Sequence, residues 1–427
     1  MRWDLPVRPG AYRVRLLFAE TARRAQARRA RVFDVRVEGA TVLDNLDVFA
    51  KAGGFRAIAR TVRVASDANL DIDFRRVRGN PSVNAIEVLP VEKHTAPRIT
   101  RQPDAGGTPS SPPRDGSSCR GTVISPEDDL AAAVNETSGK TFCLLPGTHD
   151  IGTHTVQPGS GTRLVGAPVT ITAPGAISAP TKLRGSSPEG IIEFSRPATG
   201  VVIENLDICC APGAKLDTDN STKQLGRGIN GSSQRATDLT VRFSRIHGNA
   251  NAGIGGIGDG AVIDHVELDH NGSESYLGCC AGGIKSADFY SLTNSYVHDN
   301  IGNGIWVDSG GSFVVTGNVV RNNTKNGIRY ENSTGYGRIL RNVVQNNSTS
   351  RARPGGGIEV NSADDAEVAF NTLGRNFNAG IIFRGSRSPV SGVAYGNVLN
   401  GDRLECGASG VTCYDNGPRP SINRMSS

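Results

Sequence analysis

A short repeat in the second half of the chain constrains the fold more than any other feature. A Gly-Ile pair recurs there at intervals of 21 to 38 residues. The pairs begin at positions 190, 228, 253, 283, 304, 327, 357 and 380. Such a period is typical of small units that stack on their neighbours and share one continuous core.

A second element, which ends in asparagine, lies between successive Gly-Ile pairs. Its copies read SRIHGN, VELDHN, SYVHDN, NVVRNN, NVVQNN and NTLGRN, and they end at Asn249, Asn271, Asn300, Asn323, Asn347 and Asn376. Asparagines at the same corner of each turn can hydrogen-bond to their equivalents above and below. Short strands, asparagine corners and loops of variable length predict a parallel β-helix, whose neighbouring turns lie about 4.8 Å apart.

The alternation of side chains along each strand predicts which residues leave this core. If the Ile of each pair points inward, the second residue after it also points inward, as for Val307, Tyr330 and Val360. The first and third residues after Ile then point outward and form one exposed band across successive turns, which we call the strip. The strip contains Lys285, Trp306, Asp308, Arg329, Glu331, Glu359, Asn361 and Arg384.

The strip contains groups that suit acid–base chemistry. Asp308 and Glu331 are expected one turn apart, and carboxylates this close tend to have different pKa values, so one can act as an acid while the other stays charged. Lys285 and Arg329 can neutralise a carboxylate or a developing negative charge. Trp306 offers a flat ring on which a sugar could stack.

His298 ends the strand before the strip and is a candidate proton carrier. It shares a column with His247, Asp269 and Arg321. We therefore predict catalytic roles for Asp308, Glu331, Lys285 and His298, and substrate contacts for Trp306, Arg329, Glu359, Asn361 and Arg384. The alternative is structural, because charges on solvent-facing strands commonly pair across the sheet and a histidine can simply occupy an asparagine corner.

We predict no metal and no cofactor at this site. The acidic residues could bind calcium, but the basic residues that alternate with them disfavour it.

The N-terminal part of the chain has a different pattern of short strands. Alternating apolar and polar residues occur in segments 11–18, 31–39, 60–66, 70–74 and 84–90. Short alternating strands separated by turn residues predict an antiparallel β-sandwich. We therefore expect an all-β protein with a sandwich at residues 1–93.

A linker and a capping helix are expected before the repeats. Residues 94–118 are rich in Pro, Gly, Ser and Thr, which is the composition of a linker. In the segment SPEDDLAAAV, Ser125 is a good N-cap and Pro126 suits the first helical position. We expect a short helix there that covers the open end of a β-helix spanning 119–427.

All eight cysteines lie after residue 118, without a Cys-x-x-Cys pair. Their even number favours disulfides over a zinc site, and disulfides imply an oxidising compartment. We expect Cys119 to pair with Cys143 and Cys406 with Cys413. The dipeptides Cys209-Cys210 and Cys279-Cys280 are expected to pair with each other. Reduced, buried thiols are the alternative.

Charge and hydropathy limit the classes of binding partner that the chain can have. Basic residues outnumber acidic ones in residues 1–118, with a cluster at Arg23, Arg24, Arg28, Arg29 and Arg31. No aromatic residue interleaves these arginines, so a solvated loop is favoured over nucleic-acid binding. No apolar run is long enough to cross a membrane. The sequence shows no signal peptide, and we expect an extracellular protein whose start is truncated.

Two resemblances extend these predictions. Segments such as FCLLPGTHDI and GGIKSADFYSLTNSYVHDNIGNGIWVD make residues 119–400 resemble the right-handed parallel β-helix (pectate-lyase-like) superfamily. That superfamily includes lyases, glycoside hydrolases, uronan epimerases and non-catalytic adhesins, and no fixed motif of its lyases or epimerases is present here. GAYRVRLLFAE and NPSVNAIEVLP make residues 1–90 resemble part of a malectin-type carbohydrate-binding domain, with Gly79 where that family has an aspartate.

The resemblances imply a carbohydrate-active protein outside the cell. We expect it to be a monomer that binds a polysaccharide in an outward groove of the β-helix and cleaves it as a lyase or glycoside hydrolase. The alternative is a non-catalytic glycan-binding or adhesion scaffold. The sequence does not distinguish the glycan or the reaction.

Overall fold

In the computed structural model the chain forms two compact units, residues 1–112 and 113–427. The structure describes the chain except for residues 8–9, 23–24, 55–56, 67–68, 92–118, 136, 214–224, 278–279, 287–288, 290, 349–354 and 418–427. The predicted linker, Arg23, Arg24 and Cys279 therefore lie outside the described residues.

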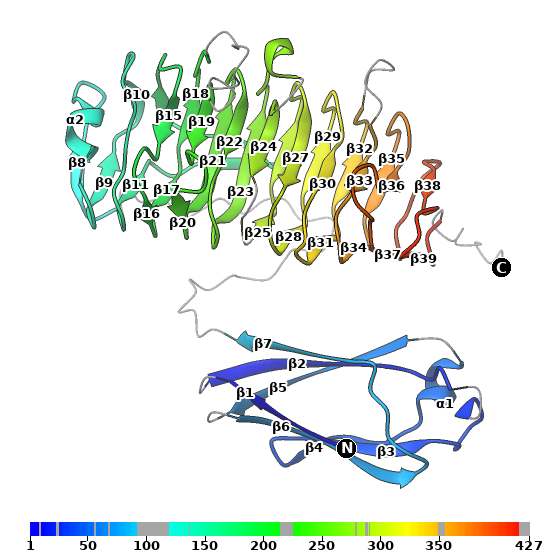
Figure 1. Cartoon of the computed structure of the whole chain (residues 1–427). Helices are drawn as coiled ribbons and strands as arrows, with labels where there is room; N and C mark the ends of the chain where they lie inside the picture. Colours follow the sequence, from blue (N-terminus) through cyan, green and yellow to red (C-terminus); the bar gives the residue numbers. More distant parts are fainter. Residues whose placement is uncertain are drawn as a thin grey trace, which may run out of the picture. The chain divides into compact units, whose positions relative to one another are not determined.

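The N-terminal unit is a sandwich of two antiparallel sheets (Figure 1). One sheet has the order β1 (Arg2–Pro6), β6 (Asn69–Arg78), β3 (Val32–Val37) and β4 (Ala40–Leu46), and the other β5 (Ala57–Ser66), β2 (Gly10–Ala19) and β7 (Ala85–Val91). Alternate residues such as Val14, Val35 and Ile72 are fully buried in one core. The predicted sandwich is confirmed, although β1, β4 and the helix α1 (Val48–Ala52) were not predicted.

The second unit is a parallel β-helix with one strand of each turn on each of three faces (Figure 1). The first face contains β9 (Thr141–Leu144), β11 (Arg163–Val165), β17 (Val202–Glu204), β25 (Ser291–Thr293), β28 (Phe313–Thr316), β31 (Gly337–Leu340), β34 (Ala366–Ala369), β37 (Gly392–Tyr395) and β39 (Val411–Tyr414), with β8 (Thr122–Ile124) beside β9. The second face contains β10 (Gly147–Asp150), β14 (Thr181–Arg184), β18 (Asp207–Cys209), β26 (Tyr296–His298), β29 (Val319–Arg321), β32 (Val343–Gln345) and β35 (Thr372–Gly374). The long strands β21 (Thr240–His247) and β23 (Val262–Asp269) run through both of these faces. The third face contains β15 (Gly190–Glu193), β19 (Arg227–Asn230), β22 (Ala252–Gly255), β24 (Gly282–Ser286), β27 (Asn303–Asp308), β30 (Ile328–Glu331), β33 (Ile358–Asn361), β36 (Ile381–Arg384) and β38 (Leu404–Glu405).

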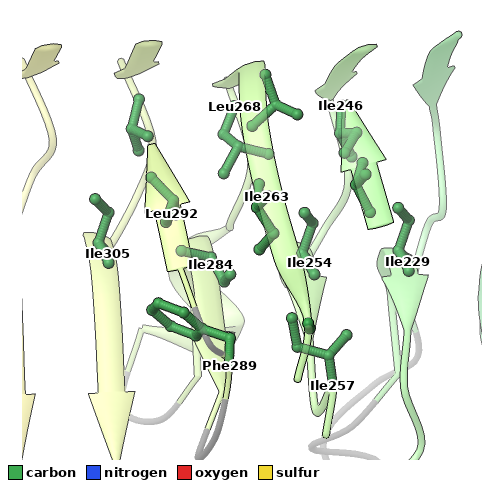
Figure 2. Packing of buried hydrophobic residues seen from close by; sticks show 14 of the residues in the cluster. Ile229, Ile246, Ile254, Ile257, Ile263, Leu268, Ile284, Phe289, Leu292 and Ile305 are labelled. Atoms are coloured by element: carbon green, nitrogen blue, oxygen red, sulfur yellow. The ribbon is translucent and has the colours of Figure 1, made fainter. Parts of the chain in front are cut away.

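The isoleucines of the repeat form a continuous row inside the third face. Ile254 pairs in register with Ile284, and Ile284 with Ile305. Figure 2 shows these side chains packed in line, together with Leu268 and Leu292 from the opposite strands. Each of them is fully buried. The predicted register is therefore confirmed, and it explains why this pair recurs despite variable loops.

The predicted asparagine ladder is also confirmed. The side-chain amide of Asn300 donates to the Asn323 oxygen at 2.9 Å, and that of Asn323 donates to Asn347 at 2.9 Å. The same bond joins each neighbouring pair from Asn249 to Asn376. A second ladder, which was not predicted, runs through Asn318, Asn342, Asn371, Asn397 and Asn416.

The capping helix forms, but it starts later than predicted. Ser125 to Asp128 is a turn in which the backbone N–H of Ser125 donates to the carboxylate of Asp128. The helix α2 (Leu130–Val134) is capped instead by Asp129, which accepts from the N–H of Ala132. The prediction of Ser125 as N-cap was wrong, because residues 125–128 close a separate turn and the side chain of Asp129 caps the helix that follows. Leu130 and Val134 still pack on the end of the core.

Three further pairs and turns project from the regular turns. They are the hairpin β12 (Thr170–Thr172) and β13 (Ala176–Ser178), the short parallel pair β16 (Ala198–Thr199) and β20 (Ala236–Thr237), and the 3-10 turn η3 (Glu274–Tyr276).

Candidate functional site

The third face brings the residues of the strip together in the predicted register. Trp306 lies beside Lys285 on one neighbouring strand and beside Arg329 on the other. Asp308 lies beside Glu331, which in turn lies beside Asn361. Glu359 lies beside Arg329, and Arg384 lies beside Asn361. A strict alternation of the strands places all eight side chains on the outer surface of this face.

The charged residues of the strip pair with one another. The Lys285 ammonium lies 3.1 Å from the Asp308 carboxylate, and the Arg329 guanidinium lies 2.6 Å from Glu331. Glu359 is shared between Arg329, at 3.6 Å, and Arg384, at 3.7 Å. The strip therefore has three cations and three carboxylates whose charges are balanced locally.

Trp306 is part of this network. Its indole N–H donates to the Glu331 carboxylate at 3.1 Å, and the residue is only 8% exposed. The Lys285 ammonium lies 4.0 Å from the ring centroid, and the Arg329 guanidinium lies 5.2 Å from it. Cations from both neighbouring strands thus contact the ring on which a sugar was expected to stack.

Glu331 is a buried acid of the strip with three hydrogen-bond donors around it. Its oxygens accept hydrogen bonds from Arg329, Asn361 and Trp306. Burial raises the pKa of Glu331, and the charge of Arg329 acts in the opposite direction. Small hollows lie on this face, one lined by Arg329, Glu359, Asn361 and Arg384 and another by Arg227, Lys285 and Asp308.

His298 does not join the strip. It ends β26 on the second face, where it lies between Asp269 and Arg321 in register, as predicted for its column. Its ring nitrogens hydrogen-bond to Glu267 at 3.0 Å and to Asp299 at 2.6 Å. The four predicted catalytic residues therefore divide between two faces, because the asparagine corner separates β26 from β27.

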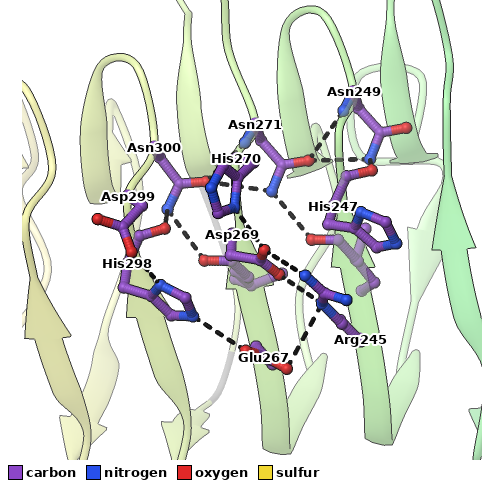
Figure 3. A network of polar contacts seen from close by, with 12 residues as sticks. Arg245, His247, Asn249, Glu267, Asp269, His270, Asn271, His298, Asp299 and Asn300 are labelled. Carbon is purple, nitrogen blue, oxygen red and sulfur yellow. Dashed lines mark hydrogen bonds and ion pairs between the residues drawn. The ribbon is translucent and has the colours of Figure 1, made fainter. Parts of the chain in front are cut away.

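A cluster of titratable residues surrounds His298 (Figure 3). Asp269 accepts two hydrogen bonds from the Arg245 guanidinium, at 2.8 and 2.7 Å, and one from His270 at 2.6 Å. Glu267 lies 3.5 Å from Arg245. The ring of Tyr296 stacks on His298, with 3.7 Å between centroids. We call Arg245, Glu267, Asp269, His270, Tyr296, His298 and Asp299 the histidine cluster.

Hydrogen bonds within the histidine cluster favour its charged forms. Burial alone would lower the pKa of His298, but the contacts with Glu267 and Asp299 raise it overall. Burial acts to raise the pKa of Asp269, but hydrogen bonds from Arg245 and His270 lower it overall. The cluster therefore holds ionised groups beneath the surface.

Glu267, Asp269 and His298 also have the residue types of a metal site. One ligand atom of each lies within 4.8 Å of the others. Their lone pairs are already engaged, however, because Arg245 donates to Asp269 and the N–H of Ile177 donates to Glu267. The guanidinium of Arg245 supplies the positive charge that a cation would otherwise provide, so these residues fit a metal poorly.

The hairpin β12–β13 covers part of the histidine cluster. The N–H of Ile177 donates to Glu267 at 2.7 Å, although the two residues are 90 positions apart. A side chain at Gly175 would come 3.0 Å from Tyr296, so only glycine fits the approach without displacing a neighbour. The hairpin leaves His270 and Arg245 accessible, with side chains 65% and 30% exposed.

A second histidine lies in an open hollow beside the histidine cluster. His247 hydrogen-bonds through Nε2 to Asp207 at 2.7 Å, and its side chain is 24% exposed. The hollow has a volume of about 290 Å³ and includes Thr148, Lys182, Arg184, Asp207, Cys209, Cys210, Arg245 and His247. Lys182 and Arg184 are exposed, and neither has an ion pair among the described residues.

Another basic hollow lies farther along the same face. It includes Arg321, Arg375 and the amide side chains of Gln345 and Asn346, and no acidic residue lines it among the described ones. The second face thus has basic hollows on both sides of the histidine cluster.

His247, Asp207, Arg245 and Glu267 were not among the predicted site residues. The signal was present, because His247 stands two places before an asparagine of the ladder, in the same column as His298. Arg245 lies two residues before His247, and Glu267 lies two residues before Asp269. The two residues pair in register, and their side chains point to the same side of their strands as His247 and Asp269.

The disulfides differ in part from the prediction. Cys119 pairs with Cys143 and Cys406 with Cys413, as predicted. Cys209 pairs with Cys210, so the two dipeptides do not pair with each other. That prediction was wrong because adjacent cysteines can bridge directly, which spacing alone did not indicate. Cys280 is also disulfide-bonded.

Comparisons with known proteins identify two family matches. Residues 1–86 match the malectin domain, and residues 227–392 and 282–425 match the right handed beta helix region. A comparison with curated proteins gives no match. None of the helices among the described residues is long and apolar enough to span a membrane.

Solved structures give weaker matches. The A-module of the Azotobacter vinelandii mannuronan C-5 epimerase AlgE4 is 14% identical, with 68% of this chain and 88% of that chain covered and a TM-score of 0.42. The enzymatically active domain of bacteriophage CBA120 tailspike protein 2 is 14% identical, with 69% and 46% covered and a TM-score of 0.43. The β-glucuronidase of Bacteroides uniformis is 25% identical, with a TM-score of 0.20, and the match covers 21% of this chain and only 11% of that chain.

Proposed function

We propose that this chain, a malectin domain followed by a right-handed β-helix, binds an acidic polysaccharide across the second face of the β-helix and cleaves it by proton transfer. His247 is the general base, and Asp207 orients it. Lys182 and Arg184 bind a negative group of the sugar next to the reacting atoms. The histidine cluster holds Arg245 in place beside them.

The observation that carries the proposal is the pair His247–Asp207 inside a basic hollow. When Asp207 is ionised, Nε2 of His247 donates to it, so Nδ1 of the neutral ring is left to accept a proton. An imidazole oriented by a buried carboxylate is a common arrangement for a general base. Cations that neutralise a substrate carboxylate also make a neighbouring C–H proton easier to remove, as a lyase requires. His247 takes this proton, a C=C bond forms as the glycosidic C–O bond breaks, and the leaving oxygen takes a proton from water.

The position of the hollows supports a polymeric substrate. From β18 to β35 the second face spans six strand spacings, or about 29 Å. The hollow at His247 lies near one end of this span, and the hollow at Arg321 and Arg375 lies near the other. A polyanion lying across the strands would meet cations at both ends.

The test is product formation from a panel of uronic-acid and neutral glycans, followed as new reducing ends and as unsaturated products. We expect cleavage of an acidic glycan by the parent protein and a loss of about 10²–10⁴-fold in His247→Gln. Glu331→Gln on the strip serves as the matched control and should retain activity. Full activity in His247→Gln, together with loss in Glu331→Gln, would move the reaction to the strip.

A second candidate function is glycan binding without cleavage. The malectin match at residues 1–86 favours it, because it points to carbohydrate binding independently of the β-helix. Electrophoresis of the full chain in gels that contain polysaccharide would then show retardation, while the same glycans yield no product.

The proposal also places the protein in an oxidising compartment, because disulfides form and persist there. Labelling of free thiols in protein taken directly from its cells should find none of the bridged cysteines reactive before reduction. Reactive Cys119 or Cys413 would contradict this placement.

A further inference from the structure

Arg227 is a buried cation without a counter-ion among the described residues. It begins β19 on the third face and is only 1% exposed. Its one described hydrogen bond runs from Nη1 to the side-chain oxygen of Asn230 at 3.2 Å, and its Nε has no partner. Burial lowers the pKa of Arg227 to about 10. An unpaired buried charge is costly, and natural proteins rarely retain one without a partner or a ligand.

Two glycines leave room for the side chain of Arg227. Gly255 and Gly256 lie beneath the guanidinium, and a side chain at Gly255 would come 2.5 Å from its Nε. Gly255 occupies the outward column between Asn230 and Lys285. The guanidinium of Arg227 therefore fills the position in the column that a side chain of β22 would otherwise take.

The guanidinium borders a hollow of about 370 Å³. Arg227, Ser233, Gln234, Gly256, Lys285, Ser286 and Asp308 line it. Asp308 is the only carboxylate among these residues, and its charge is balanced by Lys285 at 3.1 Å. The positive charge of Arg227 is thus the net charge of the hollow.

The turn that lines the hollow is strained. Ser232, Ser233 and Gln234 have φ values of 45°, 64° and 72°, in the left-handed region that residues other than glycine rarely adopt. Residues other than glycine are strained in this region, and such strained residues are associated with functional sites. This turn brings Ser233 and Gln234 to the same hollow as Arg227.

We propose that this hollow is an anion-binding site, in which Arg227 binds a single carboxylate, sulfate or phosphate group and Ser233 contributes hydrogen bonds. The site is separate from the second face and does not depend on the cleavage reaction proposed there. A carboxylate would come from a sugar acid, whereas sulfate or phosphate would be bound as a free ion or as an ester group. All three groups present two oxygen atoms that can accept hydrogen bonds from the paired N–H donors of a guanidinium.

The experiment measures thermal unfolding of the full chain with inorganic sulfate, inorganic phosphate or glucuronate, against chloride at the same ionic strength. A ligand that binds only the folded state raises the unfolding midpoint in a saturable manner. We expect at least one of the three anions to do so in the parent protein. The anion that acts identifies the source of the ligand.

Arg227→Met separates binding from structure. It removes the buried charge while keeping an unbranched side chain, so we expect this variant to be at least as stable as the parent without anion and to lose the saturable shift. Arg242→Met is the matched control, because Arg242 is 40% exposed on the first face and is paired with Glu204. It should keep the full anion response.

The outcomes that overturn the proposal are equally specific. Absence of a saturable shift with all three anions in the parent would exclude the site. An equal shift in the parent and in Arg227→Met would assign the effect to the cations of the second face or to general salt stabilisation, and not to this hollow. If Arg227→Met is too unstable to measure, Arg227→Lys replaces it. Lys keeps the charge but loses the forked donors, so an undiminished response would contradict the role of the guanidinium.

Discussion

At the residue scale, His298 shows how contacts change the role expected from a sequence position. Its column predicted a proton carrier, but Glu267 and Asp299 occupy both ring nitrogens and Tyr296 covers one ring face. A histidine held in this way stabilises the charges around it more readily than it exchanges protons with a substrate. His247, in the same column, uses Nε2 to contact Asp207, and its Nδ1 has no hydrogen bond among the described residues; an open hollow lies beside it.

The raised pKa of His298 predicts a pH-dependent contribution to stability. A group whose pKa is raised in the folded state stabilises it fully below its unfolded pKa, near 6.5, and this contribution is lost as pH rises through the folded value. His298→Gln should therefore lower the free energy of unfolding more at pH 5.5 than at pH 9. Urea denaturation at both pH values measures this.

The matched control for this prediction is His270→Gln. Its side chain is 65% exposed, so its effect on stability should be small. An equal destabilisation by His298→Gln at both pH values would show that the ring contributes only through packing.

At the element scale, the asparagine ladder ties neighbouring turns together where the chain bends. Asn323 is fully buried, donates to Asn347 and to two backbone oxygens, and accepts from Asn300. Its amide thus satisfies backbone groups that the corner removes from the sheets. Because buried polar groups without partners are costly, every member of the ladder depends on its neighbours.

Removal of one asparagine from the ladder should lower the free energy of unfolding considerably. Asn323→Ala leaves Asn300 and two carbonyl groups without their partner, and we expect it to lower the free energy of unfolding by about 2–4 kcal/mol. Gln345→Ala shortens an exposed side chain at the end of β32 and should cost under about 0.5 kcal/mol. Chemical denaturation of both variants measures the loss in free energy of unfolding. Equal losses would mean that the ladder does not stabilise the fold.

The hairpin β12–β13 also belongs to this scale. It leaves the regular turns after β11 and reaches Glu267 and Tyr296 several turns away. No sequence pattern linked Ile177 to Glu267, because such a contact depends on the path of an irregular loop. Its contact helps to bury Glu267 and Tyr296 on a face that is otherwise solvent-exposed.

At the scale of the whole molecule, the chain has two separate hydrophobic cores, one in each compact unit. We expect two unfolding transitions in calorimetry. Phe33→Ala in the sandwich should destabilise only one of them, by about 3–5 kcal/mol, and Ile305→Ala in the β-helix only the other, by about 2–5 kcal/mol. A joint shift of both transitions by either variant would show that the units unfold together.

The sequence by itself determined the fold of the β-helix and its register. Gly-Ile pairs and asparagines recur in most turns, so the same register is specified many times, and an error of one residue would turn the isoleucines outward. The neighbours of Trp306 and Glu331 on the strip followed directly. The sandwich followed from alternation in the same way, although β1 and β4 lack a clean pattern and were missed.

Only the tertiary structure decided which of these residues remain accessible to a ligand. Lys285 and Arg329 cover Trp306, and the asparagine corner separates His298 from the strip. Arg227 is buried without a counter-ion in the part of the chain that the structure describes. Cys209 bridges to its own neighbour. Such features depend on long side chains and irregular loops, whose positions follow from packing in three dimensions and not from the period of the repeat.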